Sequence, residues 1–267
     1  MEYTVRYGLE FNPFIKNSKD ILVETQDYRE AMVRLDYLKS TKGFGLLTGA
    51  PGRGKTTIIR KWSSALNTSL FKVVYTSLST LTVMEFYRNL AEQLGAAPAY
   101  RKCENFHIIQ QEINRLALEK RQTPVIILDE ANYINTKILN DLKIIFNFEM
   151  DSRDRAIVLL AGLPALNNTL RLAVHEPLRQ RLVMNYDVEG LTKEEGRIYI
   201  NEKLRGAGCT QKVFEENAVE AILNSSNGTA RMINKLCNSC LIIGNSLSLN
   251  LINADTVMKA VNECDIG

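Results

Sequence analysis

The stretch that decides the fold is Gly49-Ala50-Pro51-Gly52-Arg53-Gly54-Lys55-Thr56. It matches the pattern G-x-x-x-x-G-K-[ST], the P-loop, in which a glycine-rich turn points backbone N–H groups at phosphate oxygens. A β-prone run over residues 44–48 precedes it and an amphipathic run over residues 56–66 follows it. The turn therefore lies between a predicted strand and the start of a predicted helix, whose positive dipole end favours anions. The stretch predicts a nucleotide phosphate site.

Two side chains of the P-loop have separate expected roles. Lys55 is expected to reach the β- and γ-phosphates, and the Thr56 hydroxyl is expected to bind Mg²⁺. The pattern thus predicts ATP and Mg²⁺ as ligands. The expected nucleotide-binding residues here are Gly49, Ala50, Pro51, Gly52, Arg53, Gly54, Lys55, Thr56 and Thr57.

Two adjacent carboxylates, Asp129 and Glu130, follow a fully apolar run over residues 125–128. In a parallel α/β sheet, ligands bind outside the carboxyl ends of the strands, where the P-loop also lies. Asp129 is expected to hold the water shell of the bound Mg²⁺, and Glu130 is expected to polarise the water that attacks the γ-phosphate. A further strand between the two motifs (71–76) and the second carboxylate favour a hydrolytic class over a nucleoside kinase.

The chain alternates strand-like and helix-like segments up to residue 190 and is helix-like afterwards. This alternation predicts an α/β fold, a parallel sheet flanked by helices, over residues 1–190, followed by a small all-helical domain over 191–267. Thr192 and Glu195 form a capping-box pattern at the first helix of that domain. The expected strands are 44–48, 71–76, 125–128, 156–161 and 182–188; the expected helices are 56–66, 83–94, 106–120, 137–148, 192–204, 215–223, 230–245 and 254–263.

Composition excludes several classes of protein. The 267 residues are 45% hydrophobic, which is too apolar for a disordered chain, and no apolar run approaches a membrane span. The N-terminus has no apolar core typical of a secretory signal, and five cysteines in a chain of this length do not suggest a disulfide framework. We therefore expect a soluble cytoplasmic protein. The net charge of +3 divides into 25 basic against 21 acidic residues before Gly190, and 8 against 9 from there on.

Arginines stand at two further places. Arg179 and Arg181 precede the last predicted strand, and Arg231 lies at the start of a helix in the tail. A guanidinium supplied by a neighbouring subunit can neutralise the charge that develops on a γ-phosphoryl group. An arginine in the helical tail can sense the same phosphate within its own subunit.

Together these motifs resemble the AAA+ ATPases. More narrowly, the chain is similar to the ExeA-type (general secretion pathway protein A) branch and to the related TnsC/TniB/IstB/MuB transposition ATPases. The resemblance covers nearly the whole chain. It is carried by Tyr7-Gly8-Leu9, Asn12-Pro13-Phe14, Gly43-Phe44-Gly45-Leu46-Leu47-Thr48-Gly49, Leu128-Asp129-Glu130-Ala131, Ala161-Gly162-Leu163-Pro164, Arg179-Gln180-Arg181-Leu182 and Ile233-Asn234-Lys235-Leu236-Cys237.

The resemblance implies roles for several residues. Arg181 matches the arginine-finger position and Arg231 the second sensor, while Asn12, Pro13 and Phe14 match the segment near the adenine. One departure concerns the first sensor, which is usually a polar residue after the glycine of the fourth strand and is Leu163 here. Asn167 and Thr48 are weak substitutes, so hydrolysis is expected to be slow or to rely on another side chain.

The resemblance also implies partners. Transposition ATPases of this kind form homo-oligomers, as rings or helical filaments on duplex DNA, and recruit a transposase. Members of the secretion branch continue past the helical domain into a membrane span and a peptidoglycan-binding domain. With neither in these 267 residues, we expect the transposition role, with the secretion role as the alternative. A nucleotide-locked scaffold that hydrolyses almost nothing is a third reading, which Leu163 permits.

Loops carrying Arg101, Lys102, Arg153 and Arg155 are candidates for sequence-tolerant phosphate contacts.

Overall fold

The computed structural model describes residues 2–77 and 80–264, which group into two compact units. We call residues 30–50 and 55–188 the sheet unit. The helical unit contains the chain up to Arg29, the P-loop tip Pro51–Gly54, and the chain from Glu189 onward. The predicted boundary near residue 190 lies beside the point where the chain enters the helical unit. The N-terminal segment, which the sequence predicts to be part of the α/β domain, groups with the helices instead.

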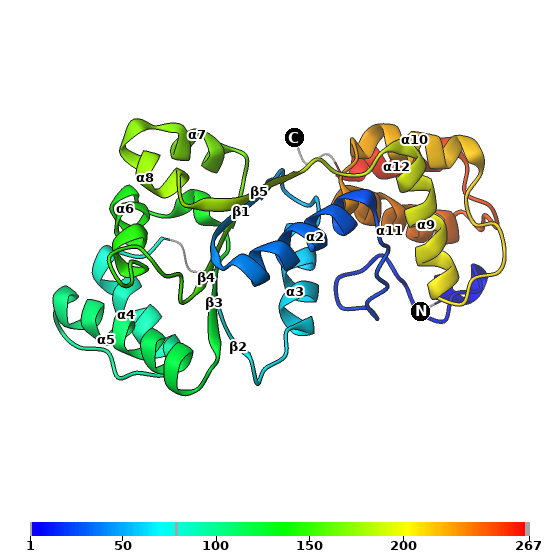
Figure 1. Cartoon of the computed structure of the whole chain (residues 1–267). Helices are drawn as coiled ribbons and strands as arrows, with labels where there is room; N and C mark the ends of the chain where they lie inside the picture. Colours follow the sequence, from blue (N-terminus) through cyan, green and yellow to red (C-terminus); the bar gives the residue numbers. More distant parts are fainter. Residues whose placement is uncertain (1, 78–79, 265–267) are drawn as a thin grey trace. The chain divides into compact units, whose positions relative to one another are not determined.

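A five-stranded, all-parallel sheet forms the centre of the sheet unit, with strand order β2-β3-β4-β1-β5 (Figure 1). Every predicted strand is present, because each is a short apolar or β-branched run bounded by turn residues. The strands are β1 (Gly43–Gly49), β2 (Phe71–Thr76), β3 (Thr123–Leu128), β4 (Ile157–Gly162) and β5 (Leu182–Val188).

Strand β4 separates the P-loop strand from the strand that carries the two carboxylates. Leu160 of β4 pairs with Leu46 of β1 on one side and with Leu128 of β3 on the other. Strand β2, which lies between the two motifs in the chain, forms an edge of the sheet instead. The sheet therefore does contain a further strand between the two motifs, but the strand that lies between β1 and β3 is β4 and not β2.

Helices cover the two faces of this sheet. Alternate strand residues such as Ile126 and Val158 belong to one apolar core with α4, α5 and α6. On the other face, Leu38 of α2 lies so close to Gly45 of β1 that a Cβ at that glycine would come within 2.5 Å of it. The helices of this part are α2 (Gln26–Thr41), α3 (Lys55–Ala65), α4 (Val83–Leu94), α5 (Lys102–Asn114), η1 (Arg115–Glu119), η2 (Ala131–Tyr133), α6 (Thr136–Ile145), α7 (Ala165–Arg171), η3 (Ala173–His175) and α8 (Glu176–Arg179).

The helical unit has its own apolar core. All four helices predicted after residue 190 are present, and the capping box of Thr192 and Glu195 starts the first of them. Tyr7, Leu9 and Phe14 from the N-terminal segment are buried among these helices, which explains why the segment groups with them. The unit's helices are α1 (Glu2–Arg6), α9 (Lys193–Gly206), α10 (Glu216–Ser226), α11 (Ala230–Ser246) and α12 (Ala254–Cys264).

Candidate nucleotide-binding site

The P-loop joins the end of β1 to the first residue of α3. Gly52 has a φ of +77°, which favours glycine, and a Cβ there would lie 2.7 Å from Cβ of Arg231. The backbone N–H of Arg231 donates to the Gly52 carbonyl at 3.2 Å. The tip of the P-loop is therefore packed against the start of α11 within the helical unit. A side chain at position 52 would force the two segments apart.

Lys55 is buried, with 6% of its surface exposed. Its Nζ donates to the Gly49 carbonyl at 2.7 Å and to the Ala50 carbonyl at 3.1 Å. A buried ammonium needs such acceptors because desolvation penalises an uncompensated charge. These two carbonyls hold the ammonium against the entry to the P-loop, at the carboxyl end of β1, where a phosphate would meet it.

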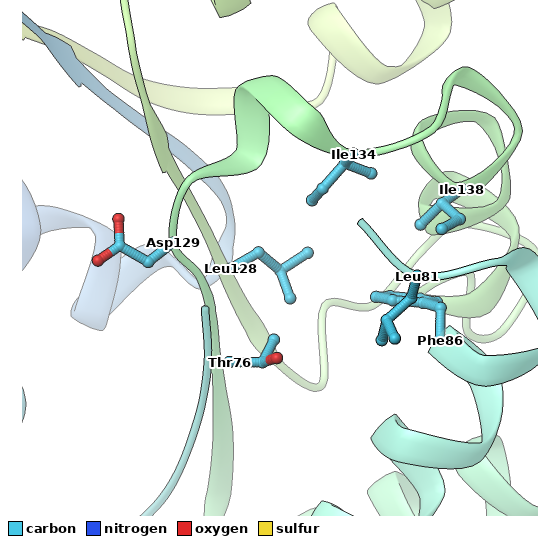
Figure 2. Close-up of a pocket in the computed structure, with 7 residues that line it drawn as sticks. All are labelled: Thr76, Leu81, Phe86, Leu128, Asp129, Ile134 and Ile138. Atoms are coloured by element: carbon cyan, nitrogen blue, oxygen red, sulfur yellow. The ribbon is translucent and has the colours of Figure 1, made fainter. Parts of the chain in front are cut away.

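The Asp129 carboxylate stands at the end of β3 with both oxygens hydrogen-bonded. Oδ2 accepts from the Thr56 hydroxyl at 3.2 Å and from the Tyr75 hydroxyl at 2.9 Å. Oδ1 accepts from the backbone N–H of Glu130 at 2.9 Å. Figure 2 shows this carboxylate directed away from the apolar side chains of Leu81 and Ile134, which line a small pocket behind it.

The Thr56 and Asp129 oxygens fit a divalent cation. A hydroxyl and a carboxylate that already touch are the hard oxygen donors that Mg²⁺ prefers. Tyr75, from the neighbouring strand β2, adds a third oxygen at the same carboxylate. Burial, followed by the hydrogen bond to Asp129, raises the pKa of Tyr75 to about 12, so its hydroxyl remains a donor at neutral pH.

Glu130 is exposed and adopts the left-handed backbone conformation, with φ +52° and ψ +36°. That conformation costs a residue with a side chain about 1 to 2 kcal/mol, so the surroundings must hold it. The following 3₁₀ turn η2 does so in part, because the N–H of Tyr133 donates to the Glu130 carbonyl at 3.1 Å. The side-chain oxygen of Asn132 accepts from the N–H of Leu163 at 3.0 Å, which joins this turn to the end of β4.

A second polar cluster lies at the same edge of the sheet. Nδ2 of Asn167, on α7, donates to the Thr48 hydroxyl at 3.0 Å, and that hydroxyl donates to Oδ1 of Asp187 at 2.7 Å. Thr48 is fully buried beside the P-loop, whereas Leu163 contributes its backbone N–H to Asn132. The two side chains named as substitutes for the first sensor are thus in contact with each other.

Residues 38–170 match the family model described as an AAA domain, and this range includes the P-loop, both carboxylates and β4. The chain belongs to the AAA+ ATPases. It is 30% identical, over 247 residues, to General secretion pathway protein A of Aeromonas hydrophila; the match covers 90% of this chain and 44% of that relative. The chain thus spans less than half of the relative's length.

Solved structures share the fold of this AAA+ ATPase. The structure of Cdc6p from Pyrobaculum aerophilum has a TM-score of 0.73 and 16% identity, covering 96% of this chain and 71% of that chain. The ORC1 protein of Aeropyrum pernix, in complex with DNA, has a TM-score of 0.67 and 18% identity, covering 95% and 69%. At such identities the likeness concerns the fold alone.

Arg181 of this AAA+ ATPase lies at the amino edge of the sheet, next to the pair formed by Leu182 and Phe44. Its guanidinium donates to the carbonyls of Lys143 (2.7 Å) and Phe146 (3.2 Å) and pairs with Asp151. The side chain is 17% exposed. The guanidinium expected to serve a neighbouring subunit is therefore held by acceptors of its own chain.

Other expected site residues are placed within the helical unit. Asn12 is buried, and its Nδ2 donates to Asn238 at 2.7 Å and to Tyr3 at 3.2 Å, while its Oδ1 accepts from the N–H of Phe14. Phe14 belongs to the core of this unit. Arg231 is exposed. Asn12 and Phe14 thus have structural contacts within the helical unit, and their expected place near the adenine stays a prediction.

The candidate DNA-contacting side chains differ in availability. Lys102 pairs with Asp141 at 2.6 Å, and Arg155 pairs with Glu149 and is 14% exposed. Arg153 is 75% exposed, with Glu149 at 3.8 Å, and Arg101 is exposed. Arg101 and Arg153 therefore remain the accessible candidates of this group.

Three residues of the site were not singled out from the sequence: Tyr75, Asn132 and Asp187. Each of them contacts a residue that is far away in the chain, so no local sequence pattern predicts its place in the site. A signal existed for Tyr75 and Asp187, since both lie near the carboxyl ends of predicted strands, where polar side chains face ligands in parallel sheets. Asn132 follows the carboxylate pair by two residues but carried no such signal.

Proposed function

We propose that this chain hydrolyses ATP with Mg²⁺ at the site formed by the P-loop and the Asp129–Glu130 pair. The observation that supports it is the contact of the Thr56 hydroxyl with Asp129 at 3.2 Å. It joins the two expected Mg²⁺-binding side chains at one edge of the sheet, although they stand 73 residues apart in the chain. Bound Mg²⁺ supplies charge neutralisation on the phosphates.

The side chains divide the reaction between them. Lys55 binds the β- and γ-phosphates with its buried ammonium, and Glu130, exposed at the edge, accepts a proton from the attacking water. Asn167, held by Thr48, provides the polar contact that Leu163 does not. Arg231 responds to the nucleotide from the helical unit, with Asn12, Pro13 and Phe14 near the base. Arg181 serves the site of a neighbouring subunit after leaving its own-chain acceptors.

We further propose that the protein assembles as a homo-oligomer, a ring or a helical filament, on duplex DNA and targets transposition together with a transposase. Two observations support a DNA role. The first 189 residues carry the basic excess of the chain, and Arg101 and Arg153 are exposed. The fold is also that of the ORC1 protein in complex with DNA. Contacts to phosphates through such side chains carry no base preference, so binding should tolerate any sequence.

A second candidate function is a role in secretion or envelope assembly. It is favoured by the 30% identity to General secretion pathway protein A. Among residues 2–77 and 80–264, no helix is long and apolar enough to cross a membrane. All five cysteines are free thiols, which agrees with a reducing, cytoplasmic setting for either role.

Hydrolysis is tested with Glu130→Gln. This variant should bind ATP with wild-type affinity and release phosphate at least about tenfold more slowly, because only the base is lost. Glu119→Gln, which changes a carboxylate in η1 after α5, is the matched control and should hydrolyse ATP normally. Equal rates for wild type and Glu130→Gln would refute the assignment.

The DNA role is tested by fluorescence anisotropy on random duplex DNA, with and without ATP or a slowly hydrolysed analogue. Binding should require nucleotide and weaken steeply as salt rises, because phosphate contacts release counterions. The double variant Arg101→Ala/Arg153→Ala should reduce both the affinity and the salt slope. Absence of duplex binding at low salt, under conditions where the protein oligomerises, would favour the secretion role.

A further inference from the structure

We propose that Asn132 is a positioning residue for Glu130: it fastens the left-handed turn at Glu130 to the end of β4. The inference rests on the proposed role of Glu130 as the base. It concerns a side chain to which neither the P-loop nor the carboxylate pattern gives a role.

Glu130 needs an external constraint. Its backbone is left-handed, a conformation that side-chain-bearing residues adopt only when surrounding contacts enforce it. The bonds to Asp129 and Tyr133 are made within the same few residues and move with the turn. They shape the turn but do not anchor it to the sheet.

Asn132 supplies the anchor. Its Oδ1 accepts from the backbone N–H of Leu163, the residue that follows β4, at 3.0 Å. Because a backbone N–H can only donate, the atom facing it must be the amide oxygen, which fixes the orientation of the carboxamide. Since β4 also pairs with the P-loop strand, the bond ties Glu130 to the strand beside the phosphate site.

Gly162, the last residue of β4, makes room for this bond. A Cβ at Gly162 would lie 2.8 Å from Oδ1 of Asn132 and 3.1 Å from its backbone nitrogen. Only a residue without a side chain lets the turn come this close to the strand. The hydrogen bond between Asn132 and Leu163 therefore depends on a glycine at position 162.

The test compares Asn132→Ala, which removes the acceptor, with Asn132→Asp, which keeps an oxygen in the same place. Asn132→Ala should lower kcat about tenfold, because a displaced base no longer meets the water. KM and the ATP dissociation constant should stay within about twofold, since Lys55 and Thr56 are untouched. Asn132→Asp should recover most of the rate.

Asn135→Ala is the matched control, because Asn135 also accepts a backbone N–H, that of Lys137 at 2.9 Å, in the same loop but without reaching β4. It should leave kcat unchanged. In a Glu130→Gln background, Asn132→Ala should have no further effect, since a positioning residue acts only through its base. Hydrogen exchange at the Leu163 amide should accelerate in Asn132→Ala and remain slow in Asn132→Asp, whatever the activity.

Three results would overturn the inference: a rate for Asn132→Ala equal to that of Asn135→Ala, an equal loss in the Glu130→Gln background, or unchanged exchange at Leu163. Loss of ATP affinity together with kcat would assign Asn132 a general structural role instead. A wild-type rate for Glu130→Gln itself would refute the proposed base, while the exchange measurement would still report whether Asn132 holds Leu163.

Discussion

The hydroxyl of Tyr75 donates a hydrogen bond to Oδ2 of Asp129 at 2.9 Å, and it does so from the neighbouring strand. The same oxygen accepts from Thr56. The carboxylate that we propose to bind Mg²⁺ is therefore already oriented by two hydroxyls. A hydrogen bond to a charged group contributes about 1.5 to 3 kcal/mol, which is enough to affect metal affinity measurably.

Tyr75→Phe should raise the Mg²⁺ concentration for half-maximal ATPase activity by about two- to tenfold, because Asp129 loses one of the groups that orient it. The pKa of Tyr75, near 12, predicts that the wild-type advantage is constant between pH 6 and pH 9. Tyr133→Phe, on an exposed tyrosine nearby, is the control. A Mg²⁺ titration that superimposes for wild type and Tyr75→Phe would contradict the role.

Lys55→Ala should remove most of the ATP affinity, because the phosphates lose their buried cation. Isothermal titration calorimetry measures the affinity directly. Arg60→Ala, an exposed cation on the same helix α3, should bind ATP like wild type. Equal affinities for wild type and Lys55→Ala would exclude the P-loop as the nucleotide site.

Arg181→Ala should abolish ATP hydrolysis by the assembled protein, whereas Arg179→Ala, whose side chain contacts the carbonyl of Arg171, should not. Mixing Arg181→Ala subunits with Glu130→Gln subunits should restore part of the activity, since some interfaces then combine intact Glu130 with intact Arg181. A mixture as inactive as its parents, with mixed oligomers present, would show that Arg181 acts only within its own chain.

The acceptors of Arg181 add a second expectation. Asp151 pairs with the guanidinium, so Asp151→Asn weakens the hold on it within the subunit. If Arg181 has to leave this pair to reach a neighbour, Asp151→Asn should increase the oligomer's ATPase rate. A decrease would mean that the ion pair itself is needed for the active arrangement.

Glu195 predicts a pH dependence of the helical unit's stability. Burial alone would raise its pKa, but hydrogen bonds from the N–H of Gln26 and from Thr192 outweigh burial and lower it. A carboxyl group whose pKa is lower in the folded state than in the unfolded chain stabilises the fold at pH values above the unfolded-state pKa. This contribution is lost as the pH falls through the folded-state pKa. The destabilisation caused by Glu195→Gln should thus be full at pH 7 and shrink in acid, once the pH falls below the ordinary pKa of a glutamate, as thermal unfolding would show.

Much of the fold was predictable from local patterns. The strands and the helices after residue 190 follow from apolar periodicity and from caps such as Thr192. Helix α2 was missed because it buries only three side chains, Ala31, Leu35 and Leu38, and therefore lacks a strong amphipathic signal. The grouping of the N-terminal segment with the helices depends on contacts between distant residues such as Tyr7 and Leu249, which no local pattern encodes.

The candidate site also contains residues that local patterns predict and contacts that they do not predict. Lys55, Thr56, Asp129 and Glu130 are recognisable because backbone geometry and phosphate chemistry constrain their spacing. The contacts of Tyr75 with Asp129 and of Asn132 with Leu163 depend instead on which strands are neighbours in the sheet. Strand order is a tertiary property, and the placement of β4 rather than β2 between the two motifs shows why the chain order alone misleads.

Strand β4 also determines how the site responds to thermal motion. Its backbone is paired on both sides, with Leu46 of the P-loop strand and with Leu128 before the carboxylates. Amide protons buried in such a doubly paired strand exchange only when the whole domain opens. We therefore expect the strands β1 and β3, which carry the two halves of the site, to unfold together. A temperature that loosens one half loosens the other, so ATP binding and hydrolysis should be lost together on heating rather than in succession.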